Sequence, residues 1–339
     1  MAGFNVVVVG ASGAVGHELL KILDEKNFPL GKLRLCATAR SAGKQIPFRG
    51  ETYTVEETTP DSFENMDIAL FAGGAASLEF GPAAVERGCV VIDNSSNYRL
   101  DPKVPQVVPE VNPEDVRWHK GIIANPNCST ILMVVALKPI HDAARIKRVV
   151  VSTYQAVSGA GQEGIEELAA QTWAVLKGGE YPPKKFAHQI AFNLIPHIDV
   201  FQEMDYTKEE WKMVKETHKI MHDDSIGITA TTVRVPIYRS HSESVNIETA
   251  KKITAGEARE VLAGAPGIVV VDNPANNEYP MPFFCSDRDE VFVGRIREDN
   301  SIEKGLNLWV VSDQIRKGAA TNTVQIAELL IKYSCLRGR

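Results

Sequence analysis

Residues 4–16 read Phe-Asn-Val-Val-Val-Val-Gly-Ala-Ser-Gly-Ala-Val-Gly, and this stretch decides the fold class of the first part of the chain. A short, mostly apolar run predicts a buried strand, and the residues from about 17 to 26 predict a helix. A glycine-rich turn between strand and helix lets the backbone approach a pyrophosphate at the helix N-terminus. The spacing is GxxGxxG rather than GxGxxG, and a turn without a ligand is the alternative. We expect a dinucleotide here, in contact with Gly10, Ser12, Gly13, Ala14 and Val15.

The end of the next predicted strand, at about residues 33–37, indicates which dinucleotide is bound. An NAD site usually has an acidic residue there, which binds the ribose hydroxyl groups. This chain has Thr38, Arg40 and Ser41 instead. A cation with hydroxyl groups suits the 2′-phosphate of NADP, whereas a solvated loop arginine is the alternative. The sequence therefore favours NADP over NAD.

Further strands are predicted at residues 67–72 and 89–93, with a helix at about 78–87 between them. This alternation predicts a mainly parallel, doubly wound sheet, whose ligands bind at the carboxyl ends of the strands. Gly73 and Ser95 lie at those ends, and we expect both to contact the cofactor. Arg99 lies just beyond, where a solvated loop arginine is the alternative. The proline-rich residues 102–113 are expected to form a surface connection.

Cys128 is the candidate nucleophile of the chain. Residues 121–124 predict a buried strand, Pro126 ends it, and residues 129–141 have the pattern of a long apolar helix. Cys128 is therefore expected at or just before a helix N-terminus, where unpaired N–H groups and the helix dipole stabilise an anion. Such a position can lower the pKa of a thiol enough to give a thiolate near neutral pH. A buried, inert cysteine is the alternative reading.

The second part of the chain has a different pattern. Long strands are expected, with few helices between them, which predicts an α+β domain whose mixed or antiparallel sheet is covered on one face. The uncovered face could serve as a dimer interface. We expect a dinucleotide-binding domain at residues 1–127, completed by a C-terminal helix within 314–339, and a catalytic and dimerisation domain at 128–313. The strands are expected at residues 147–157, 228–237, 242–251, 268–272, 291–297 and 306–312, and the helices at 163–177, 207–222 and 255–263.

Composition excludes several classes of protein. The net charge of -6 over 339 residues argues against non-specific binding to nucleic acid. No apolar run is long enough to span a membrane. Five cysteines without a CxxC pair suit a reducing cytoplasm. His218 and His222 have the i,i+4 spacing of a zinc site, but Lys219 stands where such a motif has glutamate and no third ligand is evident, so we expect no metal.

Four motifs together resemble the bacterial aspartate-semialdehyde dehydrogenases. They are the Gly10 turn, Asn-Pro-Asn-Cys-Ser-Thr at 125–130, Gln-Ala-Val-Ser-Gly-Ala-Gly at 155–161 and Arg-Val-Pro-Ile-Tyr-Arg-Ser-His at 234–241. The resemblance extends to Lys-Gly-Ala-Ala-Thr-Asn at 317–322, nearly the whole chain. N-acetyl-glutamyl-phosphate reductases share the architecture but typically have glycine before the cysteine, where this chain has Asn127. The resemblance implies a cytoplasmic homodimer that reduces L-aspartyl-4-phosphate with NADPH to aspartate semialdehyde and phosphate, in lysine, diaminopimelate, threonine and methionine biosynthesis.

The resemblance also implies roles for individual residues. Cys128 would be the nucleophile, Gln155 would position the acyl group, and His241 would be the acid/base. Arg234 would hold the substrate carboxylate and Glu209 the amino group. Phosphate would be bound by Arg99, Asn127 and Lys212, and the cofactor would also contact Ser158, Gly161 and Asn322. From the pattern alone, Glu209 and Lys212 read better as an ion pair on a helix surface, and His241 as an ordinary histidine in a turn between strands.

Three other functions stay open at this point. The same chemistry could act on another acyl phosphate, such as that of N-acetylglutamate. A nucleotide-binding regulator without turnover is a second alternative, against which the intact cysteine, histidine and arginine set argues. A Cys–His hydrolase is the third, but it would leave the N-terminal nucleotide turn unused.

Overall fold

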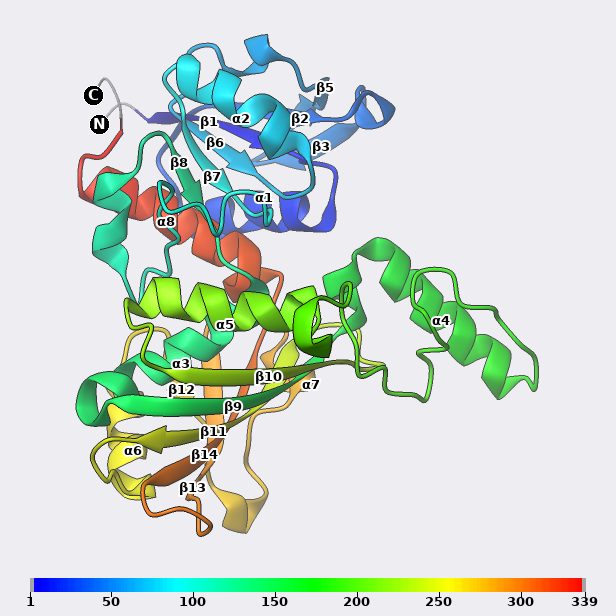
Figure 1. Cartoon of the computed structure of the whole chain (residues 1–339). Helices are drawn as coiled ribbons and strands as arrows, with labels where there is room; N and C mark the ends of the chain where they lie inside the picture. Colours follow the sequence, from blue (N-terminus) through cyan, green and yellow to red (C-terminus); the bar gives the residue numbers. More distant parts are fainter. Residues whose placement is uncertain (1–2, 337–339) are drawn as a thin grey trace. The chain divides into compact units, whose positions relative to one another are not determined.

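The computed structural model describes residues 3–336 and divides the chain into two compact units. The first unit ends at Asn127 and resumes at Ala319, and the second runs from Cys128 to Gly318. Each unit has its own six-stranded sheet (Figure 1). None of the helices in the described part of the chain has the length and apolar character needed to cross a membrane.

The first unit is a parallel sheet of the order β5-β2-β1-β6-β7-β8, which starts in its middle and extends first to one side and then to the other. Its central strands are buried on both faces, which is why they read as continuous apolar runs rather than as alternating ones. The strands are β1 (Phe4–Val9), β2 (Leu30–Ala37), β5 (Glu56–Glu57), β6 (Ile68–Phe71), β7 (Val90–Asp93) and β8 (Ile122–Ala124). The predicted doubly wound domain is confirmed.

Three α-helices complete the described part of this unit: α1 (Ala14–Glu25), α2 (Ala76–Glu86) and α8 (Thr321–Lys332). Helix α8, red in Figure 1, returns from the end of the chain and contacts both α1 and β7. The first turn of α1 needs a glycine, because a Cβ on Gly16 would lie 2.3 Å from the carbonyl oxygen of Gly10. The helix can therefore begin close against the end of β1.

A hairpin of β3 (Gln45–Phe48) and β4 (Glu51–Thr54) was not predicted. Its strands are only four residues long and partly exposed, so their apolar alternation is weak. Two short 3₁₀ segments, η1 (Ala39–Ser41) and η2 (Pro60–Phe63), flank this region.

The prediction of a surface connection at residues 102–113 is wrong. Val107 and Val108 are fully buried, and the backbone of Gln106 pairs in parallel with Ala124. The amide of Ala124 donates to the carbonyl of Pro105 at 2.9 Å. The segment thus continues the sheet beyond β8, because its apolar side chains fill the unit's core despite the neighbouring prolines. A 3₁₀ segment, η3 (Pro113–Trp118), follows it.

The second unit is a mixed sheet of the order β10-β9-β11-β14-β13-β12. β11 is antiparallel to both of its neighbours, whereas β9 pairs with β10, and β12 with β13, in parallel. The predicted α+β domain with a mixed sheet is confirmed. The strands are β9 (Ile146–Gln155), β10 (Gly227–Arg234), β11 (His241–Thr249), β12 (Ile268–Val270), β13 (Val291–Glu298) and β14 (Gly305–Ser312).

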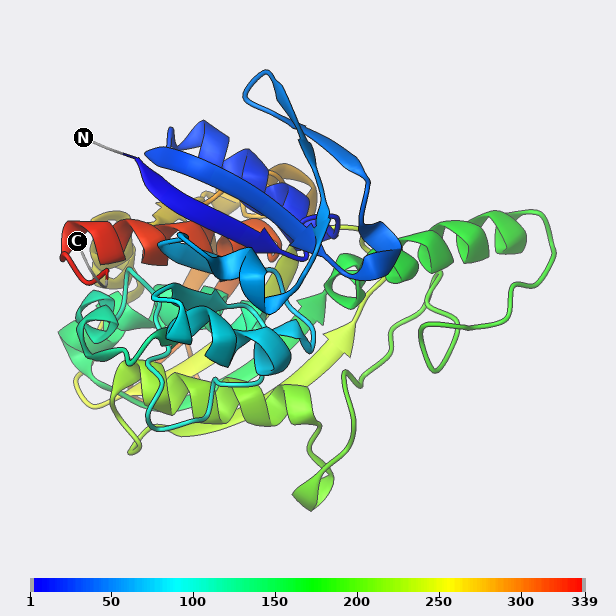
Figure 2. The same ribbon diagram turned by 90° about the horizontal axis from the view of Figure 1, so that it is seen from above.

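Helices cover one face of this sheet. α3 (Cys128–Ala144) contacts four of the strands, α5 (Lys208–Met221) lies on β10 and α3, and α6 (Ala255–Ala263) lies on β12 and β13. Alternate strand residues are accordingly fully buried or partly exposed. By contrast, α4 (Gln162–Leu176) projects from the sheet in both Figure 1 and Figure 2. Shorter elements of the unit are η4 (Val157–Ala160), η5 (Glu203–Asp205), η6 (Pro274–Asn276) and α7 (Pro282–Cys285). The π-helix η7 (Arg316–Ala320) begins at the end of this unit and continues into the returning part of the first.

Candidate active site

Cys128 is the first residue of α3, where the sequence placed it. Its side chain is partly exposed, and α3 has no acidic residue in its first turn to oppose an anion. Three other cysteines are buried thiols, and burial raises the pKa of Cys36 to about 11, of Cys89 to about 12 and of Cys285 to about 11. These three are poor nucleophiles at neutral pH. Since Cys285 is the other described cysteine of the second unit, Cys128 is the candidate nucleophile there.

His241 is the first residue of β11 and is fully buried, rather than standing in the polar turn where the sequence pattern put it. The amide of Ala156 donates a hydrogen bond to His241 Nδ1 at 3.1 Å. In the neutral ring the proton is therefore on Nε2. Burial, and then the charge of Arg234, hold the pKa of His241 well below its ordinary value. The imidazole is thus a neutral group that presents an N–H donor.

Arg234 ends β10, and its Nη1 donates to the carbonyl of Ala156 at 2.6 Å. Ala156 therefore binds Arg234 through its carbonyl and His241 through its amide. A Cβ added to Gly159 would lie 2.8 Å from Arg234 Nη1 and 3.3 Å from His241 Nε2, so the η4 turn lies directly against both side chains. Arg234 also interacts electrostatically with Glu209 and with Cys128. One cation thus lies near both the nucleophile and the imidazole.

A polar chain extends the site from β9 to α5. Gln155 Nε2 donates to Glu209 Oε1 at 3.3 Å, and Lys212 Nζ lies 3.0 Å from Glu209 Oε2. Lys212 also pairs with Asp199 at 3.0 Å. Burial lowers the pKa of Lys212, but the two carboxylates outweigh that effect and the net pKa is raised. The predicted Glu209/Lys212 pair is therefore a fixed, largely buried feature that Gln155 joins to the site.

In the first unit, the glycine-rich turn leaves the start of α1 open. Gly10 has a φ of 86°, Gly13 is the N-cap, and no side chain in the described structure caps the helix. No acidic residue lies in the first turn. Ser12, Gly13, Ala14 and Val15 are all at least partly exposed. Their backbone can approach an anion, and the residues present fit a dinucleotide phosphate.

Five other predicted cofactor residues of this unit, Thr38, Arg40, Ser41, Gly73 and Ser95, lie after the ends of β2, β6 and β7. Arg40 is exposed in η1, next to Thr38 and Ser41. Gly73, just after β6, has a φ of 134°. The hydroxyl of Ser95 donates to the buried carboxylate of Asp93 at 2.5 Å. Ser95 therefore holds the loop that follows β7.

Asn322 is fully buried, and its amide donates to the carbonyl of Val107 and to Asn125 Oδ1. The Nδ2 group of this side chain therefore already has two partners within the unit. The observed bonds tie α8 to the loop before Cys128. Arg99 also binds this loop, because its Nε donates to the carbonyl of Asn125 at 2.9 Å. Asn127, in the same loop, is buried.

The remaining two predicted cofactor residues lie in the second unit. Ser158 is in η4 and accepts a hydrogen bond from Gln314 Nε2 at 2.5 Å. Gly161, with a φ of 85°, is the N-cap of α4. Both belong to the loop that connects β9 to α4.

Similar proteins identify the chain. Residues 5–119 match the family described as "Semialdehyde dehydrogenase, NAD binding domain", and residues 137–317 match "Semialdehyde dehydrogenase, dimerisation domain". The aspartate-semialdehyde dehydrogenase of Aquifex aeolicus is 62% identical over 335 residues, which are 97% of this chain and 98% of the relative. The Bacillus subtilis aspartate-semialdehyde dehydrogenase is 51% identical, over 98% and 99% of the two chains. The chain belongs to the aspartate-semialdehyde dehydrogenase family.

Solved structures of aspartate-semialdehyde dehydrogenases have the same fold. That of aspartate semialdehyde dehydrogenase II from Vibrio cholerae, complexed with ASA, superposes with a TM-score of 0.95 at 48% identity and covers 98% of this chain and 99% of its own. The Candida albicans aspartate semialdehyde dehydrogenase with NADP has a TM-score of 0.76 at 26% identity, over 97% and 99% of the two chains. The predicted family, enzyme class and fold are confirmed.

Sequence reasoning missed the groups that hold this aspartate-semialdehyde dehydrogenase site in place. Ala156 binds His241 and Arg234 through its backbone amide and carbonyl, and the identity of its side chain does not predict such bonds. Asp199 lies 13 residues before its partner Lys212, across an irregular segment, and Gln314 lies 156 residues after its partner Ser158. A buried acid, Glu243, two residues after His241 on β11, was also missed, although an acid at an inward position of a central strand is a signal.

His241 gives the first testable prediction, because its neutral form is the stable one in the folded protein. We expect its ring signal in NMR, assigned with a His241→Asn variant, to stay constant between pH 8 and pH 6. The unfolded chain, by contrast, takes up this proton near pH 6.5. The stability that the neutral histidine contributes is therefore complete above about pH 6.5 and is lost as the pH falls toward its lower folded-state pKa. A titration midpoint at or above 6.5 would contradict this reading.

Proposed function

We propose that this chain catalyses the NADPH-dependent reductive dephosphorylation of L-aspartyl-4-phosphate to L-aspartate 4-semialdehyde and phosphate. The observation that carries the proposal is the arrangement around Arg234: a cation that interacts with the helix-starting Cys128 and shares Ala156 with His241. Family membership supports the reaction, since the matched relatives are aspartate-semialdehyde dehydrogenases.

The first chemical step falls to Cys128. Its thiolate attacks the acyl carbon, the bond to phosphate breaks, and an acyl-thioester on the enzyme results. The N–H groups at the start of α3 are candidate donors for the oxyanion that forms. Arg99, Asn127 and Lys212 are the proposed phosphate-binding groups. Lys212 is held by Glu209 and Asp199, so its ammonium group has a fixed position for an anion.

The second role is proton transfer by His241. Its Nε2 carries the proton in the neutral ring and faces the η4 turn beside Arg234. In its neutral form the ring donates a hydrogen bond from Nε2–H, which stabilises negative charge on the substrate oxygen. As the acid/base, His241 first takes up the proton that the Cys128 thiol loses, gives a proton to the substrate oxygen as the imidazolium, and takes it back in the reverse direction. A neutral imidazole suits the first of these two roles, because it can donate a hydrogen bond without first acquiring a proton in a buried, cationic environment.

The substrate is recognised by charge. Arg234 is the proposed partner of the α-carboxylate, since its planar guanidinium matches a carboxylate and its position is set by the carbonyl of Ala156. Glu209 is the proposed partner of the amino group. Gln155, bonded to Glu209, is the proposed positioning group for the acyl chain. The substrate would thus meet opposite charges at both of its ionic groups.

NADPH is the proposed cofactor. When bound, it supplies the hydride that reduces the thioester. The open start of α1 is the proposed pyrophosphate site, and Gly73, Ser95, Ser158, Gly161 and Asn322 are the remaining proposed contacts. The cytoplasm, which keeps thiols reduced, suits a catalytic cysteine.

A coupled assay in the reverse direction tests the activity. Aspartate semialdehyde, NADP and phosphate are mixed with the protein, and the reduced cofactor is followed by its absorbance. We expect a signal that depends on phosphate. Folded protein that gives no signal, where a known family enzyme reacts, would overturn the proposal.

Two further tests address the alternative functions. N-acetylglutamate semialdehyde in the same assay tests the related substrate. A substrate-like electrophile that fails to modify Cys128 would favour a non-catalytic regulator.

Arg40 tests the preference for NADP. The Arg40→Ala variant is expected to lose about tenfold or more in NADP affinity and little in NAD affinity, because hydrogen bonds to a charged group contribute about 1.5–3 kcal/mol. Binding is measured by cofactor fluorescence or calorimetry. Lys44→Ala removes another exposed cation a few residues away and is the matched control. An equal loss for both cofactors would refute the contact with the 2′-phosphate.

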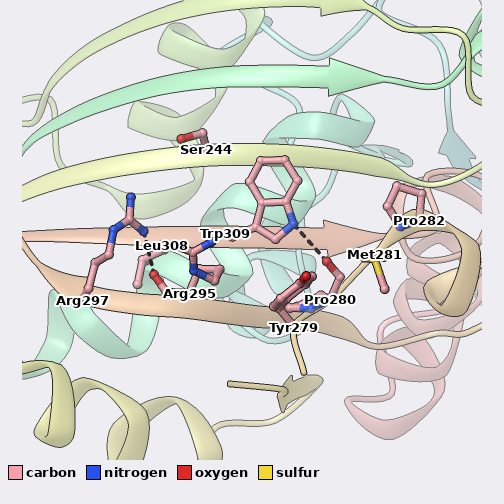
Figure 3. Close-up of a pocket in the computed structure, with 9 residues that line it drawn as sticks. All are labelled: Ser244, Tyr279, Pro280, Met281, Pro282, Arg295, Arg297, Leu308 and Trp309. Atoms are coloured by element: carbon pink, nitrogen blue, oxygen red, sulfur yellow. Dashed lines mark hydrogen bonds between the residues drawn. The ribbon is translucent and has the colours of Figure 1, made fainter. Parts of the chain in front are cut away.

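A homodimer that associates through the open face of the mixed sheet is also proposed. Tyr154 and Trp309 pack together on that face, with ring centroids 5.5 Å apart. Trp309 lines a pocket of about 370 Å³ there with Tyr279, Pro280, Met281, Arg295 and Arg297, among others (Figure 3). Phe283 and Phe284 are exposed next to it. Apolar surface of this kind marks an interface, and the match to a dimerisation domain indicates a second copy as the partner. A monomer in sedimentation at micromolar concentration would contradict this.

A further inference from the structure

A six-residue segment after β14, Asp313–Gly318, contacts the surroundings of both catalytic side chains of the second unit. Its first residues bind the turn that leads into His241, and its last residue lies against Cys128. We infer that this segment is a positioning element that sets the distance between the sulfur of Cys128 and the imidazole of His241. The inference rests on the proposed roles of these two residues and adds a set of groups that touch no substrate atom.

The first anchor is the carboxylate of Asp313, which is fully buried. Its Oδ2 accepts from Arg239 Nε at 2.6 Å and from the amide of Asp287 at 2.8 Å. Its Oδ1 accepts from the amides of Ile315 and Arg316, at 2.9 and 3.2 Å. Four donors thus surround one buried carboxylate. This fixes the start of the segment to Arg239, two residues before His241.

The second anchor is Gln314, whose amide joins two loops. Its Oε1 accepts from the amide of Ser240 at 2.8 Å, and its Nε2 donates to Ser158 Oγ. Ser240 is fully buried and has a φ of 71°, a left-handed conformation that costs a serine free energy. The hydrogen bond that Ser240 donates to Gln314 stabilises this conformation immediately before His241. At its other end, Gln314 holds η4, the turn that lies against the His241 ring and Arg234.

The third contact is at Gly318. A Cβ built on Gly318 would lie 2.8 Å from Cys128 Cβ and 3.3 Å from its Cα, so only glycine allows this approach. Gly318 lies within the π-helix η7, an element that is rare and frequent at functional sites. The wider turn of the π-helix brings the backbone against the start of α3. The segment therefore spans from the support of His241 to the nucleophile.

Two variants test the inference. For each one, the measurement is made on the catalytic residue at the opposite end of the segment. Gln314→Met removes both hydrogen bonds of the side chain at similar volume, and Gly318→Ala adds the obstructing methyl group. We expect Gln314→Met to change the rate of Cys128 alkylation by iodoacetamide severalfold. The pH dependence of that rate should shift as well. We expect Gly318→Ala to shift the NMR signal of His241. Neither readout requires turnover, so both remain valid if the proposed substrate is wrong.

In the assay, each variant is expected to lower kcat about tenfold or more with KM within threefold of wild type, because bound substrate meets misplaced groups. The double variant is expected to be about as slow as the worse single variant, since both act on one element. Gly256→Ala on α6, whose added methyl group has only Thr254 Oγ1 at 3.9 Å, is the control and should behave like wild type. Circular dichroism and thermal melting check folding.

The inference is overturned if each variant affects only its own end, or if their effects on log kcat add. It is also overturned if both folded variants keep kcat within twofold of wild type. Should Gly318→Ala fail to fold, Gln314→Met with the Cys128 alkylation readout still decides, because an unchanged alkylation profile would reject the coupling.

Discussion

Cys128→Ala is expected to lower kcat by at least about 10⁴-fold, to the background of the assay, because no thioester can form without the sulfur. The other described thiol of its unit, Cys285, cannot substitute, since burial raises its pKa to about 11. The measurement is the phosphate-dependent production of reduced cofactor. Cys335→Ala removes another partly exposed thiol, remote in sequence, and should retain activity.

NADPH affinity separates loss of chemistry from loss of structure in this variant. The cofactor is proposed to bind the glycine-rich turn of the first unit, so Cys128→Ala should bind it as wild type does. Modification by an acyl-phosphate analogue, seen as a mass shift on the Cys128 peptide, should disappear. Substantial turnover by the alanine variant would show that the reaction does not pass through this thiol.

Arg234→Leu is expected to have the second-largest effect, a loss of about 10²–10³-fold in kcat/KM. The guanidinium is buried and bonded to the carbonyl of Ala156, so it is already in position and partly desolvated before the substrate arrives. Removing one partner of such a buried charge pair costs about 2–5 kcal/mol. Most of the loss should appear in KM, because the carboxylate does not react. Steady-state kinetics with aspartate semialdehyde provide the measurement.

Two further variants make the Arg234 test specific. Arg234→Lys keeps the charge but not the planar pair of donors, and should recover only part of the loss. Arg288→Leu removes an exposed arginine that pairs with Glu290 and serves as the matched control. A normal KM for Arg234→Leu would contradict the carboxylate-binding role. A change confined to kcat would instead assign Arg234 to the support of His241 through Ala156.

The sequence predicted most of the regular structure, for reasons that lie in short stretches of chain. The buried run at residues 4–9 and the glycine turn after it are local signals, and β1 and α1 follow them. The hairpin β3–β4 was missed because its strands are too short and exposed to carry a period. Residues 102–113 were misread because local composition, with several prolines, indicated a surface loop, whereas their valines complete a core assembled from distant segments.

Individual site residues could be predicted from the sequence only where they lie in a contiguous motif. Cys128 could be placed at a helix start from Pro126 and the apolar run that follows, and α3 does begin there. His241 could not be recognised from its own surroundings, because its burial and its hydrogen bond from Ala156 depend on the pairing of β11 with β9. Its role came from the resemblance alone.

By itself, the sequence determined the two-part α/β architecture, the helix-starting cysteine and the kinship of the chain, since these depend on periodicity and on motifs that are contiguous. Only the tertiary structure decided the protonation state of His241, the pairing of Lys212 with the buried Glu209 and with Asp199, and the support of both catalytic groups by Asp313–Gly318. The physical reason is that charge, burial and hydrogen bonding depend on which groups meet in space. Some of these contacts join residues that are more than a hundred positions apart in the sequence, such as Ser158 and Gln314. No local sequence pattern predicts such contacts.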